Sequence, residues 1–321
     1  LEIKESQVVF GLSHLPDKPG IAALIFEKLS TAGINVDLII QATHEKNMNN
    51  ITFTVTNQDL KKTIEQCDLI IESLGGKYDF LENMTKLSIQ GAGIMGRPSV
   101  SAELFDSLSK ANINVRVIAT SEIKVSCIIE LKDISKAIRI VGEKFKLSNS
   151  QILINPTLEK KEDPEVRGIA LDKNQVQISF RNLPDKPGVA ASICSALADA
   201  NLVFDTIVQS DRTTKSNTKD ISLTMSKDDR KNADHTFQGI KKMLPGLQIE
   251  DGPSIAKVSA VGSGMAFKVG TAAKIFRALA NENINIEMIA TSEIRTSCIV
   301  LDKDCNKAVR AIHEYFKLNI S

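Results

Sequence analysis

A six-residue segment occurs twice in this chain, and the duplication constrains the fold more than any single motif does. The sequence Leu-Pro-Asp-Lys-Pro-Gly at residues 15–20 returns letter for letter at residues 183–188. A second pair of segments, 119–127 and 290–298, differs only where Lys124 and Val125 are replaced by Arg295 and Thr296. Two matches in the same order indicate a duplicated protein whose halves share one architecture.

Each half contains the hydrophobic pattern of two small modules. In the first module, apolar strands near residues 8–10, 36–40, 51–55 and 78–80 alternate with helices that begin after Gly20 and near Asp59. The same order recurs from Leu87 and again in the second half. The sequence therefore predicts an α+β fold of four ferredoxin-like βαββαβ modules with antiparallel sheets. Because such a sheet leaves its edges open, we expect the modules to pair side by side.

The repeat also predicts where the modules begin and end. We expect them at residues 6–83, 84–150, 172–250 and 251–321, with residues 151–171 as a linker. Residues 155–165 are rich in Lys, Glu, Asp and Pro, which is typical of an exposed joint. The apolar run at residues 166–171 is then a candidate extra strand for the fourth module.

The composition excludes several classes of partner. The 321 residues include 40 basic and 39 acidic ones, a formal net charge of +1, so no overall field recruits nucleic acid or a membrane surface. The five cysteines form no CxxC pair and are expected to be reduced, packed thiols. With no bilayer-length apolar run and no signal peptide, we expect a cytoplasmic protein.

The sequence offers little that could catalyse a reaction. Its histidines are scattered and do not recur between the halves, and it has no phosphate-binding loop, nucleophile elbow or metal-ligand cluster. Gly91, Gly93 and Gly96 fit a GxGxxG pattern, so a dinucleotide-binding oxidoreductase is a remote alternative. The equivalent stretch from Gly262 lacks the third glycine, and a hairpin follows the helix where a dinucleotide fold needs a parallel crossover. We predict no catalytic residue, no metal site and no cofactor in this chain.

The repeated Asp-Lys-Pro-Gly loops are open to two interpretations. As tight turns, they need Pro for its fixed φ, Gly for a positive φ, and Asp17 or Asp185 to accept hydrogen bonds from local NH groups. As binding loops, they lead into a helix whose first NH groups could hold a carboxylate while the aspartate holds an ammonium group. The second interpretation predicts a site for an amino-acid zwitterion.

Taken together, Leu-Pro-Asp-Lys-Pro-Gly-[Ile/Val]-Ala-Ala and Ala-Thr-Ser-Glu-Ile-[Lys/Arg] resemble the regulatory region of aspartate kinase, which is built from ACT domains. The likeness covers essentially the whole chain. It is closest to the rarer, cyanobacterial-type arrangement in which the usual pair of ACT units is duplicated to four. The family's kinase domain has no counterpart here, so we expect a truncated regulatory region or an independent regulatory subunit, with ATP and Mg bound only by the missing domain.

The resemblance implies feedback inhibition of ATP-dependent aspartate phosphorylation by lysine and/or threonine, bound between paired ACT units. It also implies a homodimer, with the kinase domain acting in cis or as a separate subunit. A ligand-free ACT dimerisation module is the alternative. The even loops at Pro98-Ser99 and Val269-Gly270 each keep only half of the Pro-Gly pair, so we place the sites on the odd loops.

Carried over by position, the expected sites each combine two modules from the same half of the chain. The first is expected to use Asp17, Gly20, Ile21, Ala22 and Gln41 with Asn112, Asn114 and Val115. The second is expected to use Asp185, Gly188, Val189, Ala190 and Gln209 with Asn283, Asn285 and Ile286. Asp37 and Asp205 share a strand face with the two glutamines and complete the set. The asparagines are equally compatible with a role as turn residues.

Overall fold

The computed structural model describes residues 1–43, 48–91, 94, 96–121, 123–156, 163–211 and 218–318. The chain divides into two compact units, each with its own hydrophobic core. Unit 1 comprises Leu1–Gln7, Leu81–Thr157 and Val176–Gly252, and unit 2 comprises Val8–Phe80, Leu158–Gln175 and Pro253–Ser321. Unit 1 therefore joins the second and third predicted modules, and unit 2 joins the first and fourth.

Unit 2 is a sheet with the strand order β3-β2-β12-β13-β11, and β1 also pairs with β3. The two modules meet where β2 runs antiparallel to β12, with Gln41 opposite Ile289. Its strands are β1 (Glu2–Pro16), β2 (Ile39–Thr43), β3 (Met48–Thr56), β11 (Gln248–Val261), β12 (Met288–Ser292) and β13 (Arg295–Leu301). Its helices are α1 (Ile21–Thr31), α2 (Leu60–Leu74), α8 (Thr271–Asn281) and α9 (Cys305–Tyr315).

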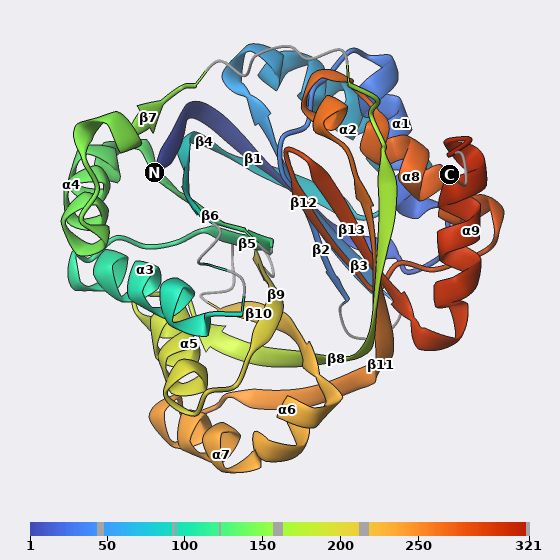
Figure 1. Cartoon of the computed structure of the whole chain (residues 1–321). Coiled ribbons are helices and arrows are strands. Elements are labelled where there is room, and N and C mark those ends of the chain that lie inside the picture. The colour runs from blue at the N-terminus through green and yellow to red at the C-terminus, as the bar shows by residue number, and fades with distance from the viewer. Residues whose placement is uncertain are drawn as a thin grey trace. The chain divides into compact units, whose positions relative to one another are not determined.

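Unit 1 repeats this plan with the order β8-β10-β9-β5-β6-β4, and β9 runs antiparallel to β5 with Gln209 opposite Ile118. Its strands are β4 (Lys77–Gln90), β5 (Val117–Ser121), β6 (Lys124–Glu130), β7 (Leu153–Ile154), β8 (Gly168–Pro184), β9 (Phe204–Asp211) and β10 (Thr218–Ser226). Its helices are α3 (Pro98–Lys110), α4 (Ile134–Phe145), α5 (Val189–Asp199), α6 (Lys227–Asn232) and α7 (Asp234–Met243). The α+β architecture of βαββαβ modules is thus as predicted (Figure 1).

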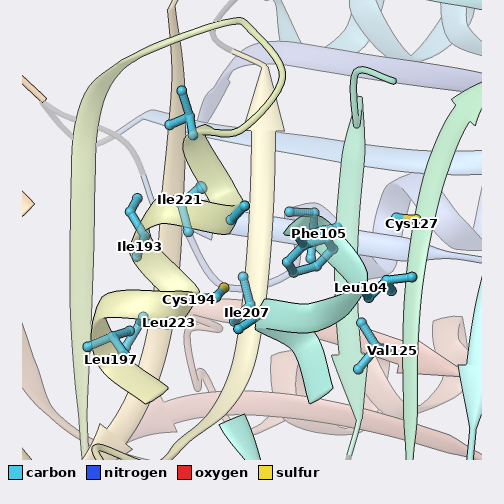
Figure 2. Packing of buried hydrophobic residues seen from close by; sticks show 14 of the residues in the cluster. Leu104, Phe105, Val125, Cys127, Ile193, Cys194, Leu197, Ile207, Ile221 and Leu223 are labelled. Atoms are coloured by element: carbon cyan, nitrogen blue, oxygen red, sulfur yellow. The ribbon is translucent and has the colours of Figure 1, made fainter. Parts of the chain in front are cut away.

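In each unit, the first helices of the two modules pack against each other, α1 on α8 and α3 on α5. The rings of Phe26 and Phe276 lie 5.5 Å apart at the first of these contacts. Figure 2 shows the corresponding core of unit 1, where Leu104 and Phe105 of α3 and Ile193 and Leu197 of α5 cover the sheet. Burial of these apolar side chains, worth about 1.5–3 kcal/mol each, is what holds the paired modules together.

The helices of each pair run antiparallel, so the start of one lies beside the end of the other. A Cβ added to Gly20, before α1, would lie 3.8 Å from Cβ of Ala280 at the end of α8. A Cβ on Gly188, before α5, would lie 2.7 Å from Oγ of Ser109 at the end of α3. This arrangement brings the loop of an odd module to the helix-to-strand connection of an even one.

Four long strands run across the division between the units, and the module boundaries expected at residues 83/84 and 250/251 fall inside β4 and β11. Three of these strands contain a residue with positive φ near the division: Ser6 (55°), Asn83 (58°) and Asn174 (67°). Asparagine, found at two of these three positions, tolerates this left-handed conformation better than most residues.

The segment that precedes β8 packs on the fourth module. The NH of Arg167 donates a 2.7 Å hydrogen bond to the carbonyl of Val261. A Cβ on Gly262 would lie 2.2 Å from the carbonyl oxygen of Glu165, and one on Gly264 would lie 2.3 Å from that of Asp163. The glycines of this turn are therefore required by the close approach of another stretch of backbone.

Candidate functional site

The unit 2 cavity lies where the loop before α1 meets the connection from α8 to β12. It encloses about 300 Å³ of non-atom space, its open mouth included. The loop and first turn of α1, the strand ends of β2 and β3, and the α8 side contribute its lining: Lys18, Pro19, Gly20, Ile21, Ala22, Ala23, Gln41, Asn49, Phe276, Ile284, Asn285 and Ile286.

Helix α1 begins at this cavity without a side-chain cap. Its N-cap is Gly20, whose φ of 95° is in the left-handed region and which has no side chain to cap the first turn; the NH of Ile21 donates to the carbonyl of Lys18 at 3.4 Å. Helix geometry leaves the first NH groups without an intrahelical acceptor, and the helix dipole adds partial positive charge there. This end of the cavity suits a carboxylate.

Asp17 immediately precedes Lys18 of the lining and contacts two residues that line the unit 2 cavity, Asn49 and Asn285. Its Oδ1 accepts hydrogen bonds from Nδ2 of Asn49 (2.7 Å) and from Nδ2 of Asn285 (2.8 Å). The same Asn285 nitrogen lies 3.5 Å from Oε1 of Glu287. Burial, followed by the negative charge of Asp17, raises the pKa of Glu287. Gln41, only 3% exposed, donates from Nε2 to the carbonyl of Ile286 at 2.7 Å.

The unit 1 cavity occupies the equivalent place, where the loop before α5 meets the connection from α3 to β5. It encloses about 380 Å³ with its open mouth. The N-cap of α5 is Gly188, with φ 96°, and it too has no side-chain cap. The lining comprises Phe105, Ile113, Asn114, Val115, Leu183, Pro184, Asp185, Lys186, Pro187, Gly188, Val189, Ala190, Ala191, Gln209, Lys219 and Ile221.

Asp185 has charged partners where Asp17 has neutral ones. Its Oδ1 accepts from Nδ2 of Asn114 (2.8 Å) and lies 2.9 Å from Nζ of Lys219, while its Oδ2 lies 3.2 Å from Nη1 of Arg116. Burial by itself would raise the pKa of Asp185, but the hydrogen bonds from Asn114 and Lys219 and the two positive charges outweigh it, so the pKa is lowered. Gln209 donates from Nε2 to the carbonyls of Val115 and Arg116, at 2.9 Å each.

The pairing expected from the sequence is wrong, because modules pair across the halves of the chain rather than within them. Asp17, expected beside Asn112, Asn114 and Val115, contacts Asn285 instead. Asp185, expected beside Asn283, Asn285 and Ile286, contacts Asn114 instead. The loops and glutamines do meet an asparagine segment in each case, but the segment belongs to the other half.

Some predicted residues lie away from the two cavities. Asn112 and Asn283 are exposed, each with φ 54°, directly after α3 and α8, in turn positions. Asp205 lines a third cavity of about 440 Å³, open mouth included, together with Arg97 and Thr120. The NH of Asp37 donates to the carbonyl of Thr54 at 3.0 Å, and Asp37 is not part of the unit 2 lining.

Four polar residues at the cavities were missed by the sequence reasoning: Asn49, Arg116, Lys219 and Glu287. Arg116 and Glu287 stand two positions after Asn114 and Asn285, and Asn49 and Lys219 stand two positions before Ile51 and Ile221. Aligning the repeats and comparing charge at equivalent positions would have found them.

Nothing in the described part of the chain suggests metal or dinucleotide chemistry. Among the described residues, no group of three or more His, Cys, Asp or Glu side chains could hold a metal ion, and no helix is both long and apolar enough to cross a membrane. Gly93 of the GxGxxG stretch lies outside the described residues. The hairpin β5–β6 follows α3, and β6 runs antiparallel to β4, whereas a dinucleotide fold has parallel neighbours.

A family model described as "ACT domain" matches residues 13–68, 87–145 and 258–316, which is more than half of the chain. The chain belongs to the ACT-domain family. The third predicted module lies outside the matched ranges, but its order β8-α5-β9-β10-α7-β11 is the same βαββαβ. The family model thus identifies three ACT domains, and the third predicted module has the same order of elements without a match.

The relatives of this ACT chain are aspartate kinases. It is 40% identical over 161 residues to aspartate kinase of Stutzerimonas stutzeri and 41% identical over 162 residues to aspartokinase of Helicobacter pylori; each match covers 50% of this chain and 39% of the relative. The crystal structure of aspartate kinase from Synechocystis is similar over 100% of this chain and 56% of that one, with a TM-score of 0.92 and 36% identity. The chain corresponds to the ACT-containing regulatory region of aspartate kinases and spans about two fifths of the length of these curated relatives.

Proposed function

We propose that this chain is the effector-binding region of an aspartate kinase. Lysine and/or threonine, bound in the unit 1 and unit 2 cavities, would give feedback inhibition of ATP-dependent aspartate phosphorylation by a kinase domain in cis or on a separate subunit. The supporting observation is that each cavity combines an uncapped helix N-terminus with the loop aspartate and a buried glutamine.

The geometry fits the two charged ends of an amino acid. The carboxylate would accept hydrogen bonds from the first NH groups of α1 or α5. The ammonium group would face the side of the cavity that carries Asp17 or Asp185. The apolar part would contact the walls formed by Phe276 and Ile284 in unit 2, or by Phe105 and Ile113 in unit 1.

Each cavity is lined by two different modules, so a ligand would stabilise one particular arrangement of the pair. A ligand shifts the equilibrium between two arrangements of the modules only by the difference between its affinities for those arrangements. Contacts to both modules of a unit supply such a difference, because they are lost when the modules separate or slide.

Calorimetric titration of the chain with L-lysine and L-threonine tests the proposal, with D-lysine and D-threonine as controls for recognition of the zwitterion. We expect saturable binding of at least one L-amino acid and no ATP turnover with aspartate and Mg. Asp17→Ala and Asp185→Ala should each weaken binding in their own unit. Absence of saturable heat at millimolar L-amino acid would contradict the proposal; if sedimentation then showed a stable dimer, the ligand-free dimerisation module would be the better description.

A further inference from the structure

The two cavities differ in charge at two matched positions. Asn49 of β3 and Lys219 of β10 occupy the same place in their strands, and Glu287 and Arg116 occupy the same place after the asparagine. Unit 2 therefore presents an amide and a carboxylate where unit 1 presents an ammonium group and a guanidinium group.

In unit 2, the two carboxylates converge on one nitrogen. Nδ2 of Asn285 lies 2.8 Å from Oδ1 of Asp17 and 3.5 Å from Oε1 of Glu287. The side chains that donate to Asp17, Asn49 and Asn285, are neutral amides. Burial first, and then the negative charge of Asp17, raise the pKa of Glu287, so a cation bound near both carboxylates would reduce their mutual repulsion.

In unit 1, the protein supplies that positive charge itself. Nζ of Lys219 lies 2.9 Å from Asp185 Oδ1 and donates to the carbonyl of Val115 at 2.8 Å, and the residue is only 4% exposed. Arg116 contacts the other carboxylate oxygen at 3.2 Å and also pairs with Oε1 of Glu130 at 2.8 Å. The negative charge of Asp185 is therefore already balanced by cations of the protein itself.

We propose that the unit 2 cavity selects an amino acid with a cationic side chain, and that Lys219 and Arg116 make the unit 1 cavity select a neutral one. The inference rests on the proposed function, since it assumes that both cavities bind amino acids. Asp17 and Glu287 supply two carboxylates for the α-ammonium and the side-chain ammonium of such a ligand. In unit 1, Asp185 would hold the α-ammonium of any amino acid, and Lys219 and Arg116 repel a second ammonium group on the side chain. Two like charges at close range in a partly dry site weaken binding, while a neutral side chain pays no such penalty.

The test uses lysine as the cationic probe and threonine as the neutral probe, with the full chain. Glu287→Gln should weaken lysine binding by about tenfold or more, as expected when a charge-assisted bond is lost, and should leave threonine binding unchanged. Asn49→Lys, which supplies unit 2 with an ammonium group beside Asp17, should have the same selective effect. Glu314→Gln, an exposed charge change on α9, is the matched control and should alter neither ligand.

The reverse exchange makes unit 1 resemble unit 2. The double variant Lys219→Asn/Arg116→Glu should bind one additional lysine per chain and lose threonine affinity, while Lys241→Asn on exposed α7 should change nothing. Circular dichroism establishes that each variant is folded before it is titrated.

Two outcomes separate this inference from the function on which it rests. If lysine and threonine both bind but Glu287→Gln and Asn49→Lys leave lysine affinity unchanged, charge selection is overturned and the proposed function stands. Two equivalent lysine sites in the unmodified chain would overturn it in the same way. If neither amino acid binds the unmodified chain, the proposed function itself fails.

Discussion

Replacing the loop aspartate by asparagine should destabilise unit 1 much more than unit 2, although the two loops are identical in sequence. The Asp185 carboxylate neutralises Lys219 at 2.9 Å, with side chains 21% and 5% exposed. Among the described residues, Asp17 accepts from the neutral amides of Asn49 and Asn285, both on Oδ1. The chain thus contains its own matched control for the cost of a buried ion pair.

The magnitudes follow from these contacts. Asp185→Asn removes the carboxylate that pairs with the buried ammonium group of Lys219, and breaking a buried ion pair in this way costs about 3–5 kcal/mol of folding free energy. Asp185 is partly exposed and Lys219 keeps its hydrogen bond to the carbonyl of Val115, so we expect a loss near the lower end, about 3 kcal/mol. Asp17→Asn keeps an oxygen that accepts from the same two amides, so it should cost about 1 kcal/mol. The difference of about 2 kcal/mol corresponds to a roughly 30-fold difference in the local opening equilibrium.

Native-state hydrogen exchange measured by mass spectrometry, without added amino acid, can resolve the two units. A single unfolding free energy is not well defined for a chain with two cores, so peptides from β9 and β10 should be compared with peptides from β2 and β3. Lys219→Gln combined with Asp185→Asn should lose less than the sum of the single variants, because the two residues form one pair. Equal losses for Asp17→Asn and Asp185→Asn would refute the reasoning.

Three further outcomes are expected. The pKa of Asp185 is lowered in the folded protein, so its contribution to the stability of unit 1 is complete above the pKa of an unfolded aspartate and is lost as the pH falls through the lower folded value. Urea unfolding at a series of acidic pH values should show this loss of stability. The Asp185→Asn variant should not show this pH dependence. Burial raises the pKa of the Cys127 and Cys194 thiols to about 12, and all five cysteines are buried, so a thiol reagent should react quickly only after denaturant is added; fast labelling of the native protein would contradict the described burial. Gln41→Leu should destabilise unit 2 by about 1–3 kcal/mol, because it leaves the carbonyl of Ile286 without its donor; an unchanged thermal midpoint would show that water replaces the amide.

Much of the local structure followed from the sequence alone. The repeated loop, the change from helical to alternating periodicity and the glycine turns predicted the βαββαβ order. The first and third modules follow it in full, whereas in the described part of the fourth module no strand follows α9. The expectation that Gly20 and Gly188 permit a positive φ is confirmed at 95° and 96°. These features depend on residues close together in the chain, where propensity and pattern act directly.

The composition of each cavity was decided by tertiary structure. Whether Asp17 meets Asn114 or Asn285 depends on which sheet edge and helix face its module finds, and the contacts that decide this, β2 with β12 and Phe26 with Phe276, join residues far apart in the chain. Every module has a sheet edge that could pair with the edge of any other module, so the hydrophobic periodicity of the sequence could not predict which two modules pair. The pairing also determines that Arg116 and Lys219 surround one aspartate while Glu287 approaches the other. The sequence by itself determined the modules and their loops; the packing of helices and strand edges between distant modules gave two identical loops opposite electrostatic surroundings.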